Sequence, residues 1–304
     1  MTKPIYGVIP PIVTPINSDE SVDEKGFRKL LRHCINVGMH GIFVAGTNGE
    51  TMGLTQAERD KAIRIALDEC AGKIPVLAGV MDTSSKRVVE NIKRLEQMGG
   101  KFAVVTPVFY SKHCSSDEFL AHYEYVSRNS NIDIMIYNIP SYTGSALTSE
   151  DIFRIAQFDH IIGYKDSGGS LPDFIKCINY FSNTEFILLQ GSSVLASSSM
   201  LAGGDGMIPS LAPVFPNIYL GVYESGKAKD IEKTTYWNKY LFEAQSLLNY
   251  SKSALAANKY VLSLLHLTSA QVIRPTQPVS NEEGEKIRLR AEEICTEAGI
   301  PNFF

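Results

Sequence analysis

The chain has 304 residues, of which 44% are hydrophobic and 20% charged, an ordinary composition for a soluble globular protein. Its net charge of −4 argues against nucleic-acid binding, which requires a basic face. The five cysteines are widely spaced without a CxxC pair, so they predict reduced thiols rather than a disulfide framework or a zinc site. Because the sequence has neither a secretion signal nor an apolar run long enough for a membrane helix, we expect a cytoplasmic protein.

Short apolar segments alternate with amphipathic ones along most of the chain. The first strand, 7–15, contains three prolines, which confine it to an irregular barrel edge or turn. The pattern predicts further strands at 42–45, 75–80, 102–107, 132–137, 161–165, 185–190 and 206–209. It predicts helices at 23–37, 55–70, 84–98, 116–127, 148–157, 171–181, 194–201 and from about 216. Capping boxes are expected at Thr55 with Glu58 and at Thr148 with Asp151.

Eight strand–helix units at short spacing predict an α/β fold, a (β/α)8 TIM barrel, over residues 1–226. The alternative, an open doubly wound sheet, usually carries GxGxxG after its first strand, and this sequence does not. Residues 227–304 are predicted to form a C-terminal helical extension, with helices at 229–248, 253–265 and 282–297. We interpret this extension as packing or oligomer surface rather than as a second catalytic unit.

The strand at 161–165 ends in Lys165, and a glycine-rich turn follows at once. A strand inside an α/β protein is buried on both faces, so a lysine at its end loses water and its pKa falls towards that of the neutral amine. A neutral amine can attack a carbonyl carbon and form a Schiff base. The alternatives are a lysine that extends into solvent or one that pairs with Asp166.

Barrel enzymes place their chemistry at the carboxyl ends of the strands. Those ends carry one amine, several phenols, hydroxyl groups and glycine-exposed amides, but almost no carboxylates or histidines. The set therefore lacks the ligands of a metal hydrolase and the carboxylate pair of a glycosidase, and it suits carbonyl chemistry. The residues concerned are Thr47, Asn48, Thr106 to Tyr110, Tyr137, Lys165, Gly191, Ser192, Ser193 and Ser210.

Taken one at a time, these residues can also be interpreted as purely structural. Tyr137 is a possible core tyrosine, and Thr47 with Asn48 a simple turn. Gly203 to Gly206 reads as a turn rather than a phosphate loop, and His113 with Cys114 as a surface loop rather than a metal site.

The combination of motifs is more specific. In order along the chain, Gly46–Glu50 (GTNGE), Tyr137–Pro140 (YNIP), Gly163–Ser167 (GYKDS) and Gly203–Gly206 leading to Ser210 resemble the family that contains N-acetylneuraminate lyase, dihydrodipicolinate synthase and 2-keto-3-deoxy sugar acid aldolases. The similarity extends over essentially the whole chain, including the helical tail.

This resemblance implies a class I mechanism on a pyruvate unit, without a metal or organic cofactor. Lys165 would form the Schiff base, Tyr137 would move protons, and Thr47 would link Tyr137 to bulk solvent. The amides of Thr47 and Asn48 would bind the pyruvate carboxylate. A tyrosine after the fourth strand would come from a neighbouring subunit of a dimer or tetramer, with Tyr110 as the candidate and Phe109 as the alternative.

Differences from the family motifs narrow the range of expected substrates. Tyr142 stands where dihydrodipicolinate synthases carry an arginine, Asn48 replaces a threonine, and Val108 with Phe109 replaces a double tyrosine. Ser192 and Ser193 replace the acidic pair of N-acetylneuraminate lyases.

What remains resembles aldolases that cleave a 2-keto-3-deoxy sugar acid or a 4-hydroxy-2-oxo acid to pyruvate and an aldehyde. Asn48 in GTNGE and the turn after Lys165 resemble 4-hydroxy-2-oxoglutarate aldolases in particular. The expected substrate contacts are Asn48, Ser167, Gly191, Ser192, Ser210 and Tyr142. The alternatives are dihydrodipicolinate synthase, N-acetylneuraminate lyase and a barrel that binds a keto acid without catalysis.

Overall fold

A computed structural model of the chain describes residues 3–113 and 115–302. Eight short strands form one sheet in which all neighbours are parallel, in the order β1-β8-β7-β6-β5-β4-β3-β2. The strands are β1 (Gly7–Val8), β2 (Ile42–Val44), β3 (Val76–Gly79), β4 (Phe102–Val105), β5 (Asp133–Asn138), β6 (Ile161–Asp166), β7 (Ile187–Gln190) and β8 (Gly206–Met207). This arrangement confirms the predicted (β/α)8 barrel with C-terminal helices.

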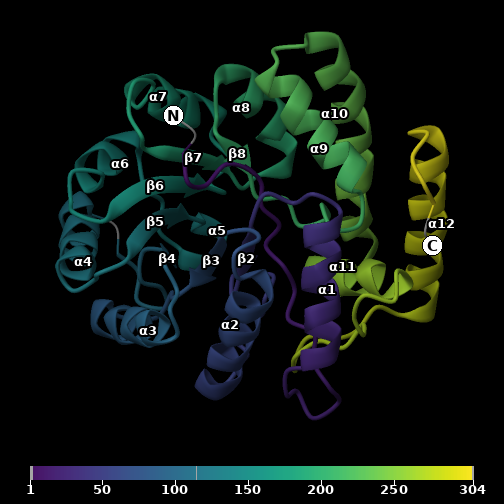
Figure 1. Cartoon of the computed structure of the whole chain (residues 1–304), viewed down its shortest axis with the longest axis horizontal. Helices are drawn as coiled ribbons and strands as arrows, with labels where there is room; N and C mark the ends of the chain where they lie inside the picture. Colours follow the sequence, from purple (N-terminus) through teal and green to yellow (C-terminus); the bar gives the residue numbers. More distant parts are fainter. Residues whose placement is uncertain (1–2, 114, 303–304) are drawn as a thin grey trace.

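Helices follow the strands and surround the sheet (Figure 1). They are α1 (Glu24–Asn36), α2 (Gln56–Cys70), α3 (Ser85–Gln97), α4 (Ser116–Arg128), α6 (Ser149–Ile155), α7 (Leu171–Tyr180), α8 (Ala196–Ala202) and α9 (Pro216–Lys227). The sequence did not predict the one-turn helix α5 (Pro140–Thr143), which directly follows β5. Residues 193 to 202 begin with a short 3-10 turn, Ser193–Leu195, which leads into α8.

The barrel closes through an irregular segment rather than a full first strand. Phe43 on β2 donates its backbone N–H to the Pro10 carbonyl, and Ile12 donates to the Phe43 carbonyl, both at 3.0 Å. The predicted strand at 7–15 was too long, because proline has no N–H to give to a ladder and only Gly7–Val8 pairs regularly with β8. The prediction of an irregular edge was correct.

Two apolar layers hold the barrel together. Side chains that point into the barrel form a small cluster of their own, and those on the outer face pack under the helices in a much larger one. Tyr137 belongs to the inner cluster, at the carboxyl end of β5. The members of the inner cluster are Ile5, Ile9, Phe43, Leu77, Val104, Met135, Tyr137, Ile139, Ile187, Leu189 and Ile208.

The two predicted capping boxes had different outcomes. Thr148 and Asp151 form a reciprocal box at the start of α6. Thr55 caps α2 by accepting from the Glu58 N–H at 3.3 Å, but the Glu58 carboxylate accepts from the Val22 N–H at 2.6 Å instead of returning to Thr55. The box predicted there is therefore wrong in its second half, because a tertiary partner competes for the carboxylate.

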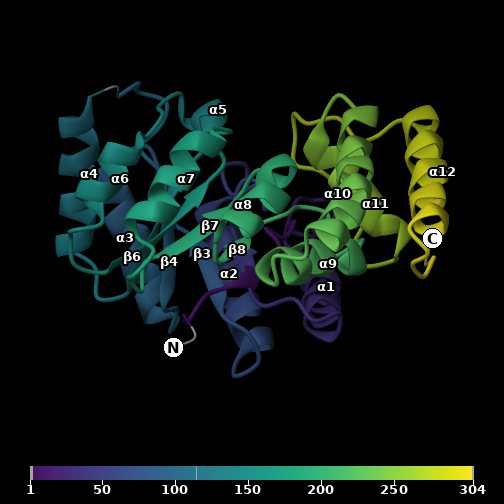
Figure 2. The ribbon, with the colours of Figure 1, turned by 90° about the horizontal axis from the view of Figure 1, so that it is seen from above.

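The C-terminal segment is helical, as predicted. It comprises α10 (Ile231–Ser246), a 3-10 turn (Leu247–Tyr250), α11 (Ala254–Leu264) and α12 (Asn281–Glu297). These helices lie together at one side of the barrel, with α12 outermost (Figures 1 and 2). The division into 1–226 and 227–304 stays a proposal. No helix in the described part of the chain combines the length and apolar character that a membrane span requires.

Candidate active site

The registers of β5 and β6 bring Tyr137 and Lys165 side by side. Tyr137 pairs with Lys165 in the parallel ladder, and Asn138 pairs with Asp166. Side chains alternate between the two faces of a strand, so Tyr137 and Lys165 share the barrel interior. The Lys165 Nζ lies 3.6 Å from the centroid of the Tyr137 ring and 4.5 Å from that of Phe43.

Lys165 is a buried amine without an ionic partner among the described residues. Its side chain is 3% exposed, and burial lowers its pKa well below the ordinary value of 10.5. The neighbouring Asp166 carboxylate is engaged elsewhere, since it accepts from the Tyr164 hydroxyl at 2.8 Å and the Gly168 N–H at 2.9 Å. Both structural alternatives for Lys165, extension into solvent and pairing with Asp166, are therefore wrong.

Tyr137 is a phenol that stays protonated at neutral pH. Burial raises its pKa to about 12, and this effect exceeds the lowering caused by hydrogen bonds with the side chains of Ser167 and Thr47. The predicted proximity of Thr47 to Tyr137 is thus present in the structure. A protonated phenol next to a neutral amine can act first as an acid and, after losing its proton, as a base.

A cavity of 290 Å³ is lined by nine of the ten residues predicted to be catalytic or substrate-binding, Lys165 and Tyr137 among them. This volume is close to the lower end of the range for small-molecule sites. The predicted residues in its wall are Thr47, Asn48, Tyr137, Tyr142, Lys165, Ser167, Gly191, Ser192 and Ser210. Gln245 on α10 also lines this cavity, and the sequence did not predict it as a site residue.

Tyr110 is the exception. Its side chain is 96% exposed and does not line the cavity, and its φ of 74° is in the left-handed region that non-glycine residues rarely adopt. Phe109 is half-buried and lines an adjoining cavity together with Thr47 and Thr106. Within one copy of the chain, Tyr110 therefore does not meet Tyr137 or Lys165.

The GTNGE loop is fixed by contacts to distant parts of the chain. Glu50 forms a fully buried ion pair with Lys259 on α11 and accepts from the Ile273 N–H at 2.8 Å. Lys259 also donates to the Gln271 carbonyl at 2.8 Å, which gives the buried cation a second acceptor. The Thr14 hydroxyl donates to the Gly49 carbonyl at 2.8 Å. The C-terminal extension thus supports the loop that carries Thr47 and Asn48.

The same loop presents backbone donors. In the described part of the chain, the amides of Thr47 and Asn48 donate no hydrogen bond to a backbone carbonyl. Thr47 and Asn48 are half-buried, and two backbone donors at the wall of a cavity suit a carboxylate or another anion. The predicted carboxylate site on this loop stays a proposal.

Gly191 is required by close packing around Lys165. A Cβ at this position would lie 2.1 Å from the Ser167 Oγ, 2.9 Å from the Asp166 carbonyl oxygen and 3.0 Å from the Lys165 Cε. Only glycine leaves room for the lysine stem and the Ser167 hydroxyl at the end of β7.

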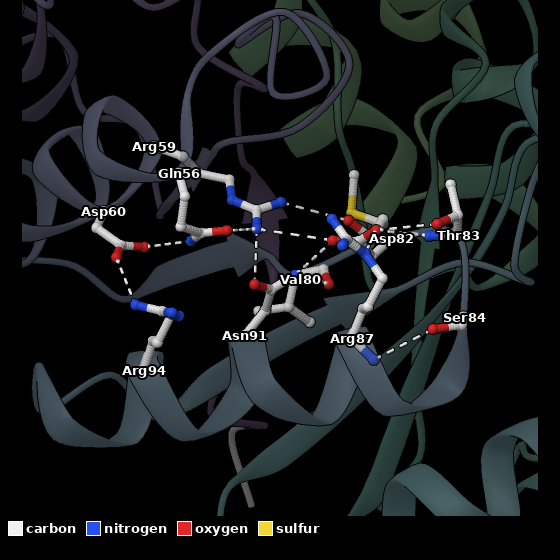
Figure 3. Close-up of polar contacts among 11 residues, drawn as sticks. Gln56, Arg59, Asp60, Val80, Asp82, Thr83, Ser84, Arg87, Asn91 and Arg94 are labelled. Carbon is white, nitrogen blue, oxygen red and sulfur yellow. Dashed lines mark hydrogen bonds and ion pairs between the residues drawn. The ribbon is translucent and has the colours of Figure 1, made fainter.

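A cluster of polar side chains outside the cavity around Lys165 fixes the segment after β3 (Figure 3). Arg59 is buried and donates to the Asn91 Oδ1 at 2.6 Å, and Asn91 donates to the Asp82 Oδ2 at 3.2 Å. Asp82 also accepts from Arg87 at 2.6 Å. The cluster holds Met81 in the wall of the adjoining cavity, so we interpret it as structural support.

No metal centre is formed by the described residues, since no group of three or more potential ligands comes together there. The described cysteines, Cys34, Cys70, Cys177 and Cys295, are buried and free, as predicted. Cys114 lies outside the described residues. Gly203 to Asp205 form a turn before β8, as expected: Gly203 ends α8 in the left-handed conformation, and Asp205 pairs with Lys3 at 2.9 Å.

Comparisons with known proteins agree with this geometry. The family model "Dihydrodipicolinate synthetase family" matches residues 4–294. An uncharacterised DapA-like lyase of Halobacterium salinarum is 31% identical over 245 residues, which cover 80% of this chain and 79% of the relative. A 4-hydroxy-tetrahydrodipicolinate synthase of Methanopyrus kandleri is 29% identical over 95% of this chain and 96% of its own. The solved dihydrodipicolinate synthase of Bacteroides thetaiotaomicron superposes with a TM-score of 0.91 at 28% identity, covering 96% of this chain and 100% of that one.

Proposed function

This chain belongs to the dihydrodipicolinate synthetase family, and from that premise we propose that it cleaves a 2-keto-3-deoxy sugar acid or a 4-hydroxy-2-oxo acid to pyruvate and an aldehyde. Members of the family are pyruvate-dependent carbon–carbon lyases that form a Schiff base on a lysine and need no external cofactor. The observation that carries the proposal is the buried Lys165 amine, 3.6 Å from the Tyr137 ring, in a cavity with hydroxyl groups and free amides.

In the first step, the neutral Lys165 amine adds to the keto carbon of the substrate. The resulting carbinolamine loses its hydroxyl group as water when Tyr137 donates its phenolic proton, which leaves a protonated imine and a phenolate. The Thr47 and Asn48 amides hold the substrate carboxylate beside this reaction. Because burial lowers the pKa of Lys165, removing its proton before the attack costs less free energy than it would for an exposed lysine.

In the second step, the Tyr137 phenolate removes the proton of the C4 hydroxyl group. The C3–C4 bond breaks, its electron pair moves towards the imine to form an enamine, and the aldehyde leaves. Protonation of the enamine at C3 and hydrolysis of the imine then release pyruvate and regenerate the amine. The reverse sequence condenses pyruvate with an aldehyde.

The neutral wall of the cavity supports an acyclic hydroxy acid as substrate. Apart from Lys165, its wall has no ionisable side chain other than two tyrosines, Tyr137 and Tyr142. Ser192, Ser193 and Ser210 offer hydroxyl groups at the distal side. This composition suits hydroxyl-bearing substrates better than an acyl chain or a charged sugar tail.

A second candidate function is dihydrodipicolinate synthesis from pyruvate and aspartate semialdehyde. It is favoured by relatives such as the 4-hydroxy-tetrahydrodipicolinate synthase of Methanopyrus kandleri. Against it, Tyr142 occupies the position of the expected arginine. Arg274, which lines the adjoining cavity, has a side chain that is 80% exposed and paired with Glu20 at 2.7 Å.

We further propose that Tyr110 acts in a second copy of the chain. Tyr110 combines a solvent-exposed side chain with a strained, left-handed backbone. Backbone strain of this kind is typical of functional sites. A dimer or tetramer would allow Tyr110 to complete the proton path at Thr47 of its neighbour.

A substrate panel tests the proposal. Purified protein would be incubated with 2-keto-3-deoxygluconate, 4-hydroxy-2-oxoglutarate, sialic acid, and pyruvate plus aspartate semialdehyde, with product formation followed by coupled pyruvate assay. Treatment with pyruvate and borohydride, followed by mass spectrometry, would locate the adduct on Lys165. We expect trapping and cleavage of the first or second compound. Turnover of the aspartate semialdehyde pair alone would favour the second candidate.

Tyr137→Phe is expected to lower kcat about 10²-fold while the borohydride adduct on Lys165 still forms. The phenyl ring keeps the packing against Lys165 and Phe43, so the loss reports the proton transfer rather than the fold. Single-turnover cleavage and trapping measure the two steps separately. Loss of the adduct together with turnover would assign Tyr137 a mainly structural role.

A further inference from the structure

We infer that the C-terminal helical extension supplies a binding subsite for the distal hydroxyl groups of the substrate, formed by Asn258 on α11 and Gln245 on α10. This inference rests on the proposed function and narrows its substrate to a polyhydroxylated 2-keto-3-deoxy acid. It also changes the interpretation of the extension, which the sequence indicated only as packing or oligomer surface.

Asn258 is the main observation. Its side chain is 1% exposed, and neither its Oδ1 nor its Nδ2 has a hydrogen-bond partner among the described residues. Gln245 is similar at one atom, since its Oε1 is buried and also unpaired. A buried amide without hydrogen-bond partners destabilises the folded chain. A ligand that supplies the missing hydrogen bonds would account for such an amide.

Both residues line the substrate cavity or a cavity that adjoins it. Gln245 lines the catalytic cavity beside Ser192 and Ser193. Asn258 lines a third cavity, distinct from the one beside Phe109, which shares Thr47, Asn48, Tyr142 and Ser210 with the cavity around Lys165. The two compartments therefore meet around Tyr142, on the side of the cavity that a long substrate would enter beyond C4.

The charge distribution indicates the chemical class of the ligand. The cavity that Asn258 lines has amides, hydroxyl groups and apolar atoms in its wall together with two charged residues, Lys252 and Glu283. Lys252 is exposed, and Glu283 already accepts from Ser280 at the start of α12. An amide offers both a donor and an acceptor, which matches a hydroxyl group, whereas a distal carboxylate would find no fixed cation there.

Lys259, the next residue on α11, is the partner of Glu50 in the GTNGE loop. The ion pair therefore ties α11 to the loop that holds the carboxylate end of the substrate. Asn258 is thereby positioned relative to Thr47 and Asn48, which gives the subsite a fixed distance from the reacting carbons.

Asn258→Leu and Gln245→Met test the inference, because each replaces an amide by an apolar group of similar shape. For 2-keto-3-deoxygluconate, kcat/KM is expected to fall ten- to a hundredfold in each variant. For 4-hydroxy-2-oxobutanoate, which ends at C4 and has no distal hydroxyl groups, kcat/KM should stay within about twofold of the parent protein. Borohydride trapping of pyruvate should be unchanged.

Thermal unfolding supplies a readout that does not depend on activity. Removal of an unpaired buried amide should leave Tm of Asn258→Leu unchanged or raise it by about 2 to 5 °C. Asn238→Leu is the matched control, since Asn238 on α10 also has a buried, unpaired Oδ1 but lines none of the cavities described above. It should leave the kinetics with both substrates unchanged.

Equal losses with the long and the short substrate would overturn the subsite, as would faster cleavage of 4-hydroxy-2-oxoglutarate than of 2-keto-3-deoxygluconate by the parent protein. A failure of the proposed function itself has a different signature, because the parent protein would then trap no pyruvate at Lys165. A lower Tm for Asn258→Leu together with lost activity on both substrates would assign Asn258 a structural role and also overturn the inference.

Discussion

Lys165→Met is expected to abolish the borohydride adduct with pyruvate and to lower turnover by about 10⁴-fold or more. Methionine fills the space of the lysine stem against Phe43 and Tyr137 but has no nucleophile. The measurement is intact-protein mass after borohydride treatment, together with the pyruvate assay on the best substrate of the panel.

The same variant should unfold at a higher temperature near neutral pH. Burial lowers the pKa of Lys165 in the folded state, so between that lowered pKa and the ordinary value of 10.5 the unfolded chain binds more protons than the folded chain. This difference destabilises the parent protein, and the penalty shrinks as the pH rises towards 10.5. The gain in Tm on replacing Lys165 should therefore be larger at pH 7 than near pH 10, as scanning calorimetry can measure.

Lys176→Met is the control, since Lys176 is on the exposed face of α7 and, among the residues that the structure describes, forms an ion pair only with Asp173. It should keep both the adduct and full activity. An adduct that persists in Lys165→Met, or that maps to another lysine in the parent protein, would contradict the proposed role of Lys165.

Sequence patterns predicted the barrel and most of the site because both depend on local order along the strands. A strand that ends in Lys165 and another that ends in Tyr137 must place these residues at the same barrel end, whatever the loops do. The register that sets them side by side could not be predicted. It depends on a shift in the pairing of β5 with β6, which occurs between Ile134 and Met135.

Contacts between distant segments were beyond the reach of sequence patterns. Glu50 reads as part of a motif and Lys259 as an ordinary helical lysine, and only the folded chain brings them together across more than two hundred residues. The unpaired amides of Gln245 and Asn258 were missed for the same reason, since periodicity marks α10 and α11 as helices without indicating which face meets the barrel mouth. A lysine and an asparagine among the alanines of α11 were the available signal.

Lys259→Met is expected to lower the free energy of unfolding by about 3–5 kcal/mol, because it leaves the Glu50 carboxylate buried without its cation. KM for the pyruvate unit should rise as well, since Glu50 and the Ile273 N–H fix the loop that carries Thr47 and Asn48. Urea unfolding measures the first effect, and the pyruvate dependence of borohydride trapping measures the second.

Lys286→Met is the matched control for Lys259→Met, because Lys286 pairs with Glu282 on the surface of α12 and exposed pairs contribute little. The double variant Lys259→Met with Glu50→Gln should recover much of the lost stability, since glutamine carries no charge but keeps an acceptor for Ile273. Recovery of stability without recovery of KM would show that the ion pair positions the carboxylate-binding loop in addition to stabilising the fold. If Lys259→Met changed neither urea unfolding nor KM, the extension would have no role in holding that loop.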